Sequence, residues 1–148
     1  RNISVLDATS HVAGYMVGQD ISERTVQMAN NPAQFSLGKS YKNFAPMGPY
    51  ITTADEIPNP QDLTITCSLN GEMMQNESTA DMAFSVHEIV SHISQVCEIR
   101  CGDVIFTGSP AGVGQGLTPP RFLRAGDVLV TRIEGIGEIR NTFVGGQE

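Results

Sequence analysis

The residues best suited to chemistry lie near the start of the chain, where an apolar stretch ends. Asp20 ends that stretch, Ser22, Arg24 and Gln27 follow it closely, and Lys39 comes a little further on. A carboxylate, a guanidinium and an amide at one junction can form a polar pocket for an anionic substrate, and a carboxylate oxygen suits a hard cation. The alternative interpretation is a surface ion pair between Asp20 and Arg24, of little energetic value. The residues alone leave both interpretations open.

This junction needs a strand before it and a helix after it. The run 13–21 is β-like and leads into Asp20. A short helix is predicted after Ser22, because serine suits the N-cap position. Frequent prolines over residues 44–60 exclude a long helix there and favour an extended path.

The strongest local signal is a hairpin that begins at residue 63. Apolar and polar side chains alternate over residues 63–69, and Asn70-Gly71 follows at once. Alternation with a period of two is typical of a half-buried strand. Asn-Gly tolerates the positive φ angles of a tight turn, so the pattern predicts a strand, a turn and a second strand.

One amphipathic helix of about three turns is predicted after residue 85. Ser85 and Glu88 fit a capping box at its start. Its predicted apolar face consists of Val86, Ile89, Val90, Ile93 and Val96 or Cys97. Beyond the helix, the runs 104–107, 128–134 and 138–144 are predicted strands. The whole pattern predicts an α+β fold in which β structure dominates.

Three motif-like stretches lack what their chemistry requires. Gly38-Lys39-Ser40 resembles the end of a phosphate-binding P-loop, but Ala33 stands where that motif requires glycine. His87 and His92 lie about 140° apart around a helix, so one face cannot hold a metal between them. The glycine-rich run 108–116 lacks the helix that a dinucleotide site needs, and is either a loop that approaches a ligand or a plain connector.

Composition narrows the class of protein. The 148 residues are 40% hydrophobic and 17% charged, which predicts one folded domain rather than a disordered chain. The net charge of -7 repels phosphate backbones and anionic lipid, so neither a nucleic acid nor a membrane is expected as a partner. Three cysteines do not suggest a disulfide framework. The first residues lack a signal-peptide pattern, and a cytoplasmic location is expected.

Seven short stretches carry a resemblance that spans nearly the whole chain. They are GYMVGQDISER (14–24), GKSY (38–41), PMGP (46–49), TADEIP (53–58), NGE (70–72), GDVIFTG (102–108) and PPRFL (119–123). With these stretches in this order, the chain resembles the fumarylacetoacetate hydrolase family. The resemblance implies the family's mixed β roll, with few short helices, in a homodimer. Residues 1–148 are then one catalytic domain that lacks its N-terminal segment.

The resemblance also assigns roles to the residues of the junction. Asp20 matches the family's aspartate ligand to a divalent cation, with Mg²⁺ expected first and Mn²⁺ or Ca²⁺ as alternatives. Arg24 and Gln27 match substrate-binding positions, and Lys39 matches the active-site lysine, with a catalytic and a binding role. Ser109 stands where many members have threonine, and its hydroxyl is expected to bind a substrate carboxylate.

The implied substrate is a small dicarbonyl or keto acid. Hydrolysis of a carbon–carbon bond in an acylpyruvate or fumarylacetoacetate-type acid is the first expectation. The alternative is an isomerase of a 2-hydroxyhepta-2,4-diene-1,7-dioate-type diacid, or an oxaloacetate-type decarboxylase, in aromatic catabolism. An inactive binding derivative is the non-enzyme alternative.

Part of the family's machinery has no match in these residues. The family's other two metal ligands form a Glu-x-Glu pair, and that pattern does not occur in the 148 residues. The His/Glu dyad of hydrolytic members cannot be placed on His11, His87 or His92. We therefore expect the segment alone to bind metal weakly and to be inactive.

Overall fold

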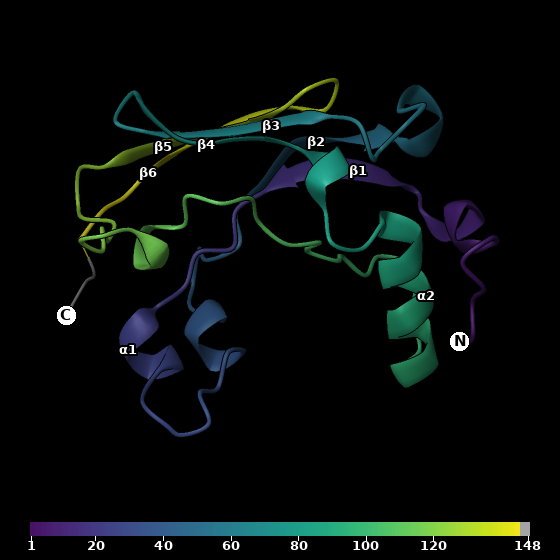
Figure 1. Cartoon of the computed structure of the whole chain (residues 1–148), viewed down its shortest axis with the longest axis horizontal. Helices are drawn as coiled ribbons and strands as arrows, with labels where there is room; N and C mark the ends of the chain where they lie inside the picture. Colours follow the sequence, from purple (N-terminus) through teal and green to yellow (C-terminus); the bar gives the residue numbers. More distant parts are fainter. Residues whose placement is uncertain (146–148) are drawn as a thin grey trace.

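The computed structural model describes residues 1–145 and consists mainly of two antiparallel sheets (Figure 1). One sheet pairs β1 (Gly14–Gly18) with β2 (Met47–Thr53). The other has the strand order β4-β3-β5-β6. Its strands are β3 (Thr64–Leu69), β4 (Glu72–Ser78), β5 (Val128–Ile133) and β6 (Gly137–Thr142). The strands predicted over 13–21, 63–69, 128–134 and 138–144 are confirmed with shifted ends, and residues 44–60 contain β2 as the predicted extended path.

The predicted hairpin forms between β3 and β4. Its turn is Asn70-Gly71, with φ angles of 53° and 86°. Positive φ at both central turn positions matches the right-handed twist of the two strands, and glycine adopts it without strain. β5 pairs with the other edge of β3, from Leu69 opposite Leu129 to Ile65 opposite Ile133, so that β3 lies inside the sheet.

The two sheets pack against each other through β2 and β6. Between them lies a buried cluster of Val17, Ile57, Ile136 and Ile139. A second buried cluster joins Ile21, Cys67, Leu69 and Leu129. Val17 of the first cluster precedes Asp20, and Ile21 of the second cluster follows it directly. Buried contacts therefore hold the chain on both sides of Asp20. Burial of apolar surface thus fixes the place where the chain leaves the sheet.

The predicted capping box begins α2 (Val86–Val96). The Ser85 hydroxyl accepts from the backbone N–H of Glu88 at 3.2 Å, and the Glu88 carboxylate accepts from the backbone N–H of Ser85 at 2.7 Å. Burial of Val86 and Val90 agrees with the predicted apolar face. The prediction was wrong for the end of that face, where Val96 and Cys97 are exposed.

Two serines take the place of those residues in the buried face of α2. Ser94 Oγ accepts from the backbone N–H of Ile3 at 2.9 Å, and Ser91 Oγ donates to the carbonyl of Ile3 at 2.8 Å. Both serines are buried because the N-terminal segment covers them and satisfies their hydroxyls. Apolar periodicity in the sequence does not reveal this packing.

The strand predicted over 104–107 was wrong. Residues 97–127 contain one 3₁₀ turn, at Gly114–Gly116, and no strand. Val104 and Phe106 are 47% and 42% exposed, and within residues 1–145 no backbone hydrogen bond joins 104–107 to a neighbouring strand. An apolar run becomes a strand only when another strand pairs with it.

The remaining helices are short. α1 (Arg24–Gln27) has one turn, and 3₁₀ turns occur at η1 (Ala8–His11), η2 (Leu37–Lys39), η3 (Ala54–Glu56), η4 (Thr79–Asp81) and η5 (Gly114–Gly116). In Figure 1 both α helices lie on the same side of the sheets, at opposite ends of the molecule. The predicted α+β class, dominated by strands, is confirmed. Within residues 1–145 no helix is long and apolar enough to cross a membrane.

Candidate active site

The site is built at the turn from β1 into α1. The predicted N-cap at Ser22 was wrong, because Glu23 caps α1 instead. Its carboxylate accepts from the backbone N–H of Val26 at 2.5 Å and of Thr25 at 3.1 Å. The hydrogen bond from Val26 is the main cause that lowers the pKa of Glu23 below its ordinary value. The carboxylate offers two acceptor oxygens, and each of them accepts from one of these N–H groups.

Ser22 is thereby free for the lysine of η2. Lys39 Nζ forms an ion pair with Asp20 Oδ2 and donates to Ser22 Oγ at 3.0 Å. The lysine and aspartate side chains are 31% and 37% exposed, so water reaches both. The alternative interpretation predicted an ion pair between Asp20 and Arg24. That prediction was wrong, because Asp20 pairs with the ammonium group of Lys39.

Arg24 is held by Gln27 one turn further along α1. Arg24 Nη1 donates to Gln27 Oε1 at 2.5 Å. The Gln27 side chain is fully buried, and its Nε2 has no hydrogen-bond partner among the described residues. Of the residues predicted to bind substrate, Gln27 is the one that does not line the cavity described below. In this structure it contacts Arg24 instead.

Gly38 brings Lys39 close to α1. The carbonyl of Gly38 accepts from the backbone N–H of Glu23 at 2.7 Å. A Cβ atom on residue 38 would lie 2.8 Å from the carbonyl oxygen of Glu23 and 3.0 Å from Cβ of Gln27. Only glycine allows this approach, so the Gly-Lys pair that resembles part of a P-loop serves to bring the lysine beside Asp20.

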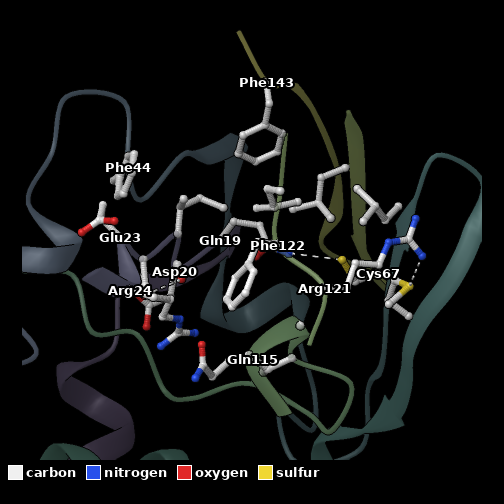
Figure 2. Close-up of a pocket in the computed structure, with 18 of the residues that line it drawn as sticks. Gln19, Asp20, Glu23, Arg24, Phe44, Cys67, Gln115, Arg121, Phe122 and Phe143 are labelled. Carbon is white, nitrogen blue, oxygen red and sulfur yellow. Dashed lines mark hydrogen bonds between the residues drawn. The ribbon is translucent and has the colours of Figure 1, made fainter. Parts of the chain in front are cut away.

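These side chains open into a cavity of about 690 Å³. Asp20, Arg24, Lys39 and Ser109 all line it, so four of the five predicted site residues meet at one place. Figure 2 shows Asp20, Glu23 and Arg24 on one side, Cys67 and Arg121 on the other, and Gln19 and Phe122 between them. The glycine-rich run 108–116 forms part of the wall, which favours the first of its two interpretations.

The model of the fumarylacetoacetate hydrolase C-terminal domain matches residues 1–144. The chain belongs to the fumarylacetoacetate hydrolase family. It is 42% identical over 144 residues to the mitochondrial oxaloacetate tautomerase FAHD2B of Bos taurus, an alignment that covers 97% of this chain and 46% of that protein. The chain thus spans about half the length of the curated relatives it matches.

Solved structures of the family share the fold. A fumarylacetoacetate hydrolase from Exiguobacterium antarcticum matches with a TM-score of 0.93 and 39% identity, over 99% of this chain and 52% of that one. A fumarylpyruvate hydrolase from Pseudomonas aeruginosa, solved with Mn²⁺ and pyruvate, matches with a TM-score of 0.86 and 32% identity, over 97% of this chain and 59% of that one. The family fold expected from the sequence is confirmed.

The cavity of this family member concentrates positive charge in an acidic chain. Arg24, Lys39, Arg121 and Arg124 line it, against the carboxylates of Asp20 and Glu23. Arg121 also pairs with Glu72, Nη1 to Oε2 at 2.5 Å, at the edge of β4. The whole chain carries a charge of -7. The cavity wall is therefore locally more positive than the chain as a whole.

Gln19 and Cys67 line the cavity and were missed by the sequence reasoning. Gln19 Nε2 donates to Thr131 Oγ1 at 2.7 Å and to Cys67 Sγ at 3.4 Å. Burial raises the pKa of the Cys67 thiol. A signal for Gln19 was present, because it stands directly before Asp20 at the end of a predicted strand. Its two partners lie on strands distant in the sequence, which no local pattern reveals.

The family implies a divalent metal, and Asp20 is the described residue expected to bind it. The Asp20 carboxylate, water-accessible and at the cavity wall, is the hard oxygen ligand that such a cation prefers. Within residues 1–145 no group of three histidine, cysteine, aspartate or glutamate side chains could hold a metal. His87 instead forms a hydrogen bond to Thr9, Nε2 to Oγ1 at 3.0 Å. Asp20 thus fits as one ligand and needs others.

Proposed function

We propose that the full-length protein interconverts the keto and enol forms of a small 2-oxo dicarboxylate such as oxaloacetate. The observation that carries the proposal is the contact of Lys39 with Asp20 and Ser22 beside Arg24, in one water-accessible cavity. The tautomerase activity named for the relative at 42% identity supports this reaction over the others in the family.

The chemistry follows from where charge develops. When a base takes a proton from C3 of the 2-oxo acid, the electron pair of that C–H bond becomes negative charge on the C2 oxygen, which then gains a proton to give the enol. Fixed cations beside that oxygen stabilise the charge as it forms. Lys39 Nζ is the cation nearest the Asp20 carboxylate, and Arg24 offers a planar guanidinium suited to a carboxylate. Ser109 supplies a hydroxyl from the facing loop.

A divalent metal, Mg²⁺ in our proposal, would have Asp20 as one ligand and would polarise the C2 carbonyl when bound. The Glu-x-Glu pair that the family resemblance implies would supply the other ligands from outside residues 1–148. Support for a metal comes from the Mn²⁺ in the related fumarylpyruvate hydrolase.

Hydrolysis of an acylpyruvate is the second candidate. It uses the same enolate, since breaking the carbon–carbon bond releases an enolate of pyruvate. The related fumarylpyruvate hydrolase, solved with pyruvate, favours it. Hydrolysis also needs a base that activates water. No histidine lines the cavity among the described residues, so the part of the site seen here is the part that both reactions share.

The assay that tests the proposal uses the full-length protein with oxaloacetate, and follows the ultraviolet absorbance of the enol with and without Mg²⁺. Parallel assays measure cleavage of an acylpyruvate and release of CO₂ from oxaloacetate. Lys39→Met is expected to lower kcat/KM for tautomerisation by about 100-fold or more, because it removes the cation beside the C2 oxygen. Lys42→Met is the matched control, since Lys42 is an exposed lysine that does not line the cavity.

An enol–keto rate equal to the uncatalysed rate would reject tautomerisation, and acylpyruvate cleavage would then establish the second candidate. Activity on none of these acids would support an inactive binding derivative. Rates independent of metal would reject the proposed role of Mg²⁺. We further propose that residues 1–148 form one catalytic domain of a cytoplasmic homodimer, which sedimentation and fractionation would test.

A further inference from the structure

Gln19 has an anchored side chain. Its backbone N–H donates to the carbonyl of Pro46 at 3.0 Å, which fixes the end of β1 against the segment before β2. Its amide Nε2 donates to Thr131 on β5 and Cys67 on β3, at 2.7 Å and 3.4 Å. Those two residues are register partners in the sheet and are only 2% and 4% exposed. The amide is therefore held by buried groups on two strands.

The anchors also set the orientation of the amide. Thr131 Oγ1 donates to Cys67 Sγ at 3.8 Å, so the threonine oxygen is left to accept from an N–H group. Gln19 consequently presents its N–H side to the sheet. Its oxygen, Oε1, accepts from no residue within 1–145 and is not a buried atom. Because Gln19 lines the cavity, this free acceptor is open to it, beside Asp20.

We propose that Gln19 Oε1 recognises the hydroxyl group of the enol form of the substrate and discriminates against the keto form. An amide oxygen accepts hydrogen bonds and cannot donate them. The enol carries an O–H group on C2, whereas the keto form carries an acceptor oxygen there, which an amide oxygen repels. This inference rests on the proposed tautomerisation and adds to it the residue that tells the two forms apart.

The test compares two stable dicarboxylates as competitive inhibitors of the full-length enzyme. Malate carries a hydroxyl on C2, as the enol does, and succinate lacks it. The ratio of their inhibition constants is measured in the wild type and in Gln19→Met, which has similar volume and no acceptor. This ratio expresses how much more tightly malate binds than succinate. The preference for malate is expected to fall about threefold to tenfold in Gln19→Met, as for the loss of one hydrogen bond. Any contribution of the hydroxyl to metal binding cancels in this comparison.

Thr131→Val supplies an independent variant that leaves the lining of the cavity unchanged, because Thr131 anchors the amide without lining the cavity. Thr131→Val is expected to reduce the preference for malate over succinate too. It provides the test of the proposed hydrogen bond if Gln19→Met does not fold. Gln95→Met, on the exposed side of α2, is the control and keeps the wild-type ratio. An unchanged ratio in active Gln19→Met overturns the role of Gln19 alone. Absence of oxaloacetate turnover in the wild type overturns the proposed function.

Discussion

At the scale of single residues, the site depends on which polar groups bind one another. Lys39 binds Asp20 and Ser22, and Arg24 donates a hydrogen bond to Gln27, so each cation is held in place before a substrate arrives. A guanidinium fixed by a buried acceptor loses less entropy on binding a carboxylate than a mobile one does. The fully buried position of Gln27 thus suits a residue that positions Arg24, and not one that contacts a ligand itself.

Gln27→Met tests that role. The change removes the acceptor of Arg24 and also removes an amide N–H that has no partner in the described chain. Loss of the hydrogen bond destabilises the fold, and loss of a buried unpaired donor stabilises it by a similar amount, so the free energy of unfolding is expected to change by no more than about 1 kcal/mol. KM is expected to rise about tenfold with a smaller change in kcat.

Gln95→Met, the same substitution at an exposed position of α2, is the matched control. Its KM is expected to stay near the wild-type value. Steady-state kinetics give KM and kcat, and urea unfolding gives stability. Equal KM values for Gln27→Met and wild type would show that the buried amide does not position Arg24.

At the scale of elements, local signals were sufficient for the turn between β3 and β4 and for the start of α2, but not for the start of α1, which Glu23 caps in place of Ser22. The Asn70-Gly71 turn and the Ser85-Glu88 capping box each lie within four residues, and both form as predicted. The prediction over 104–107 failed because a strand depends on a distant partner. The ion-pair partner of Asp20 was missed for the same reason: the Asp20 to Lys39 pair spans a 19-residue separation that no local pattern specifies.

The capping box allows a prediction for α2. Ser85→Ala removes an acceptor at the helix start and is expected to cost about 1 kcal/mol of unfolding free energy. Hydrogen bonds from the backbone N–H and the hydroxyl of Ser85 lower the pKa of Glu88 below its ordinary value of 4.5. A lowered folded pKa stabilises the protein above the ordinary pKa, and this stability is lost as the pH falls through the folded value.

The stability difference between wild type and Glu88→Gln is therefore expected to shrink as the pH is lowered from about 6 to about 3. Urea unfolding at several pH values measures it. Gln95→Ala, at an exposed position of the same helix, is the control and is expected to show no such pH dependence. A difference that grows on acidification would contradict the assigned role of the carboxylate.

At the scale of the whole molecule, the described residues hold the cations that we propose bind substrate and the carboxylate that we propose as one metal ligand. Arg24, Lys39 and Asp20 meet in one cavity, and the chain matches about half of each curated relative. A single carboxylate is a weak site for a hard divalent cation, which prefers six or more oxygen ligands. Asp20 is moreover paired with Lys39, so a cation must compete with an ammonium group.

These facts predict that residues 1–148, expressed alone, bind Mg²⁺ weakly and do not turn over an acylpyruvate or oxaloacetate, whereas the full-length protein does. Calorimetric titration with Mg²⁺ and the enol absorbance assay measure the two properties. Circular dichroism establishes first that the segment is folded, since an unfolded segment would be inactive for another reason. Measurable turnover by the folded segment would show that Asp20, Lys39 and Arg24 suffice for the chemistry without further ligands or a further base.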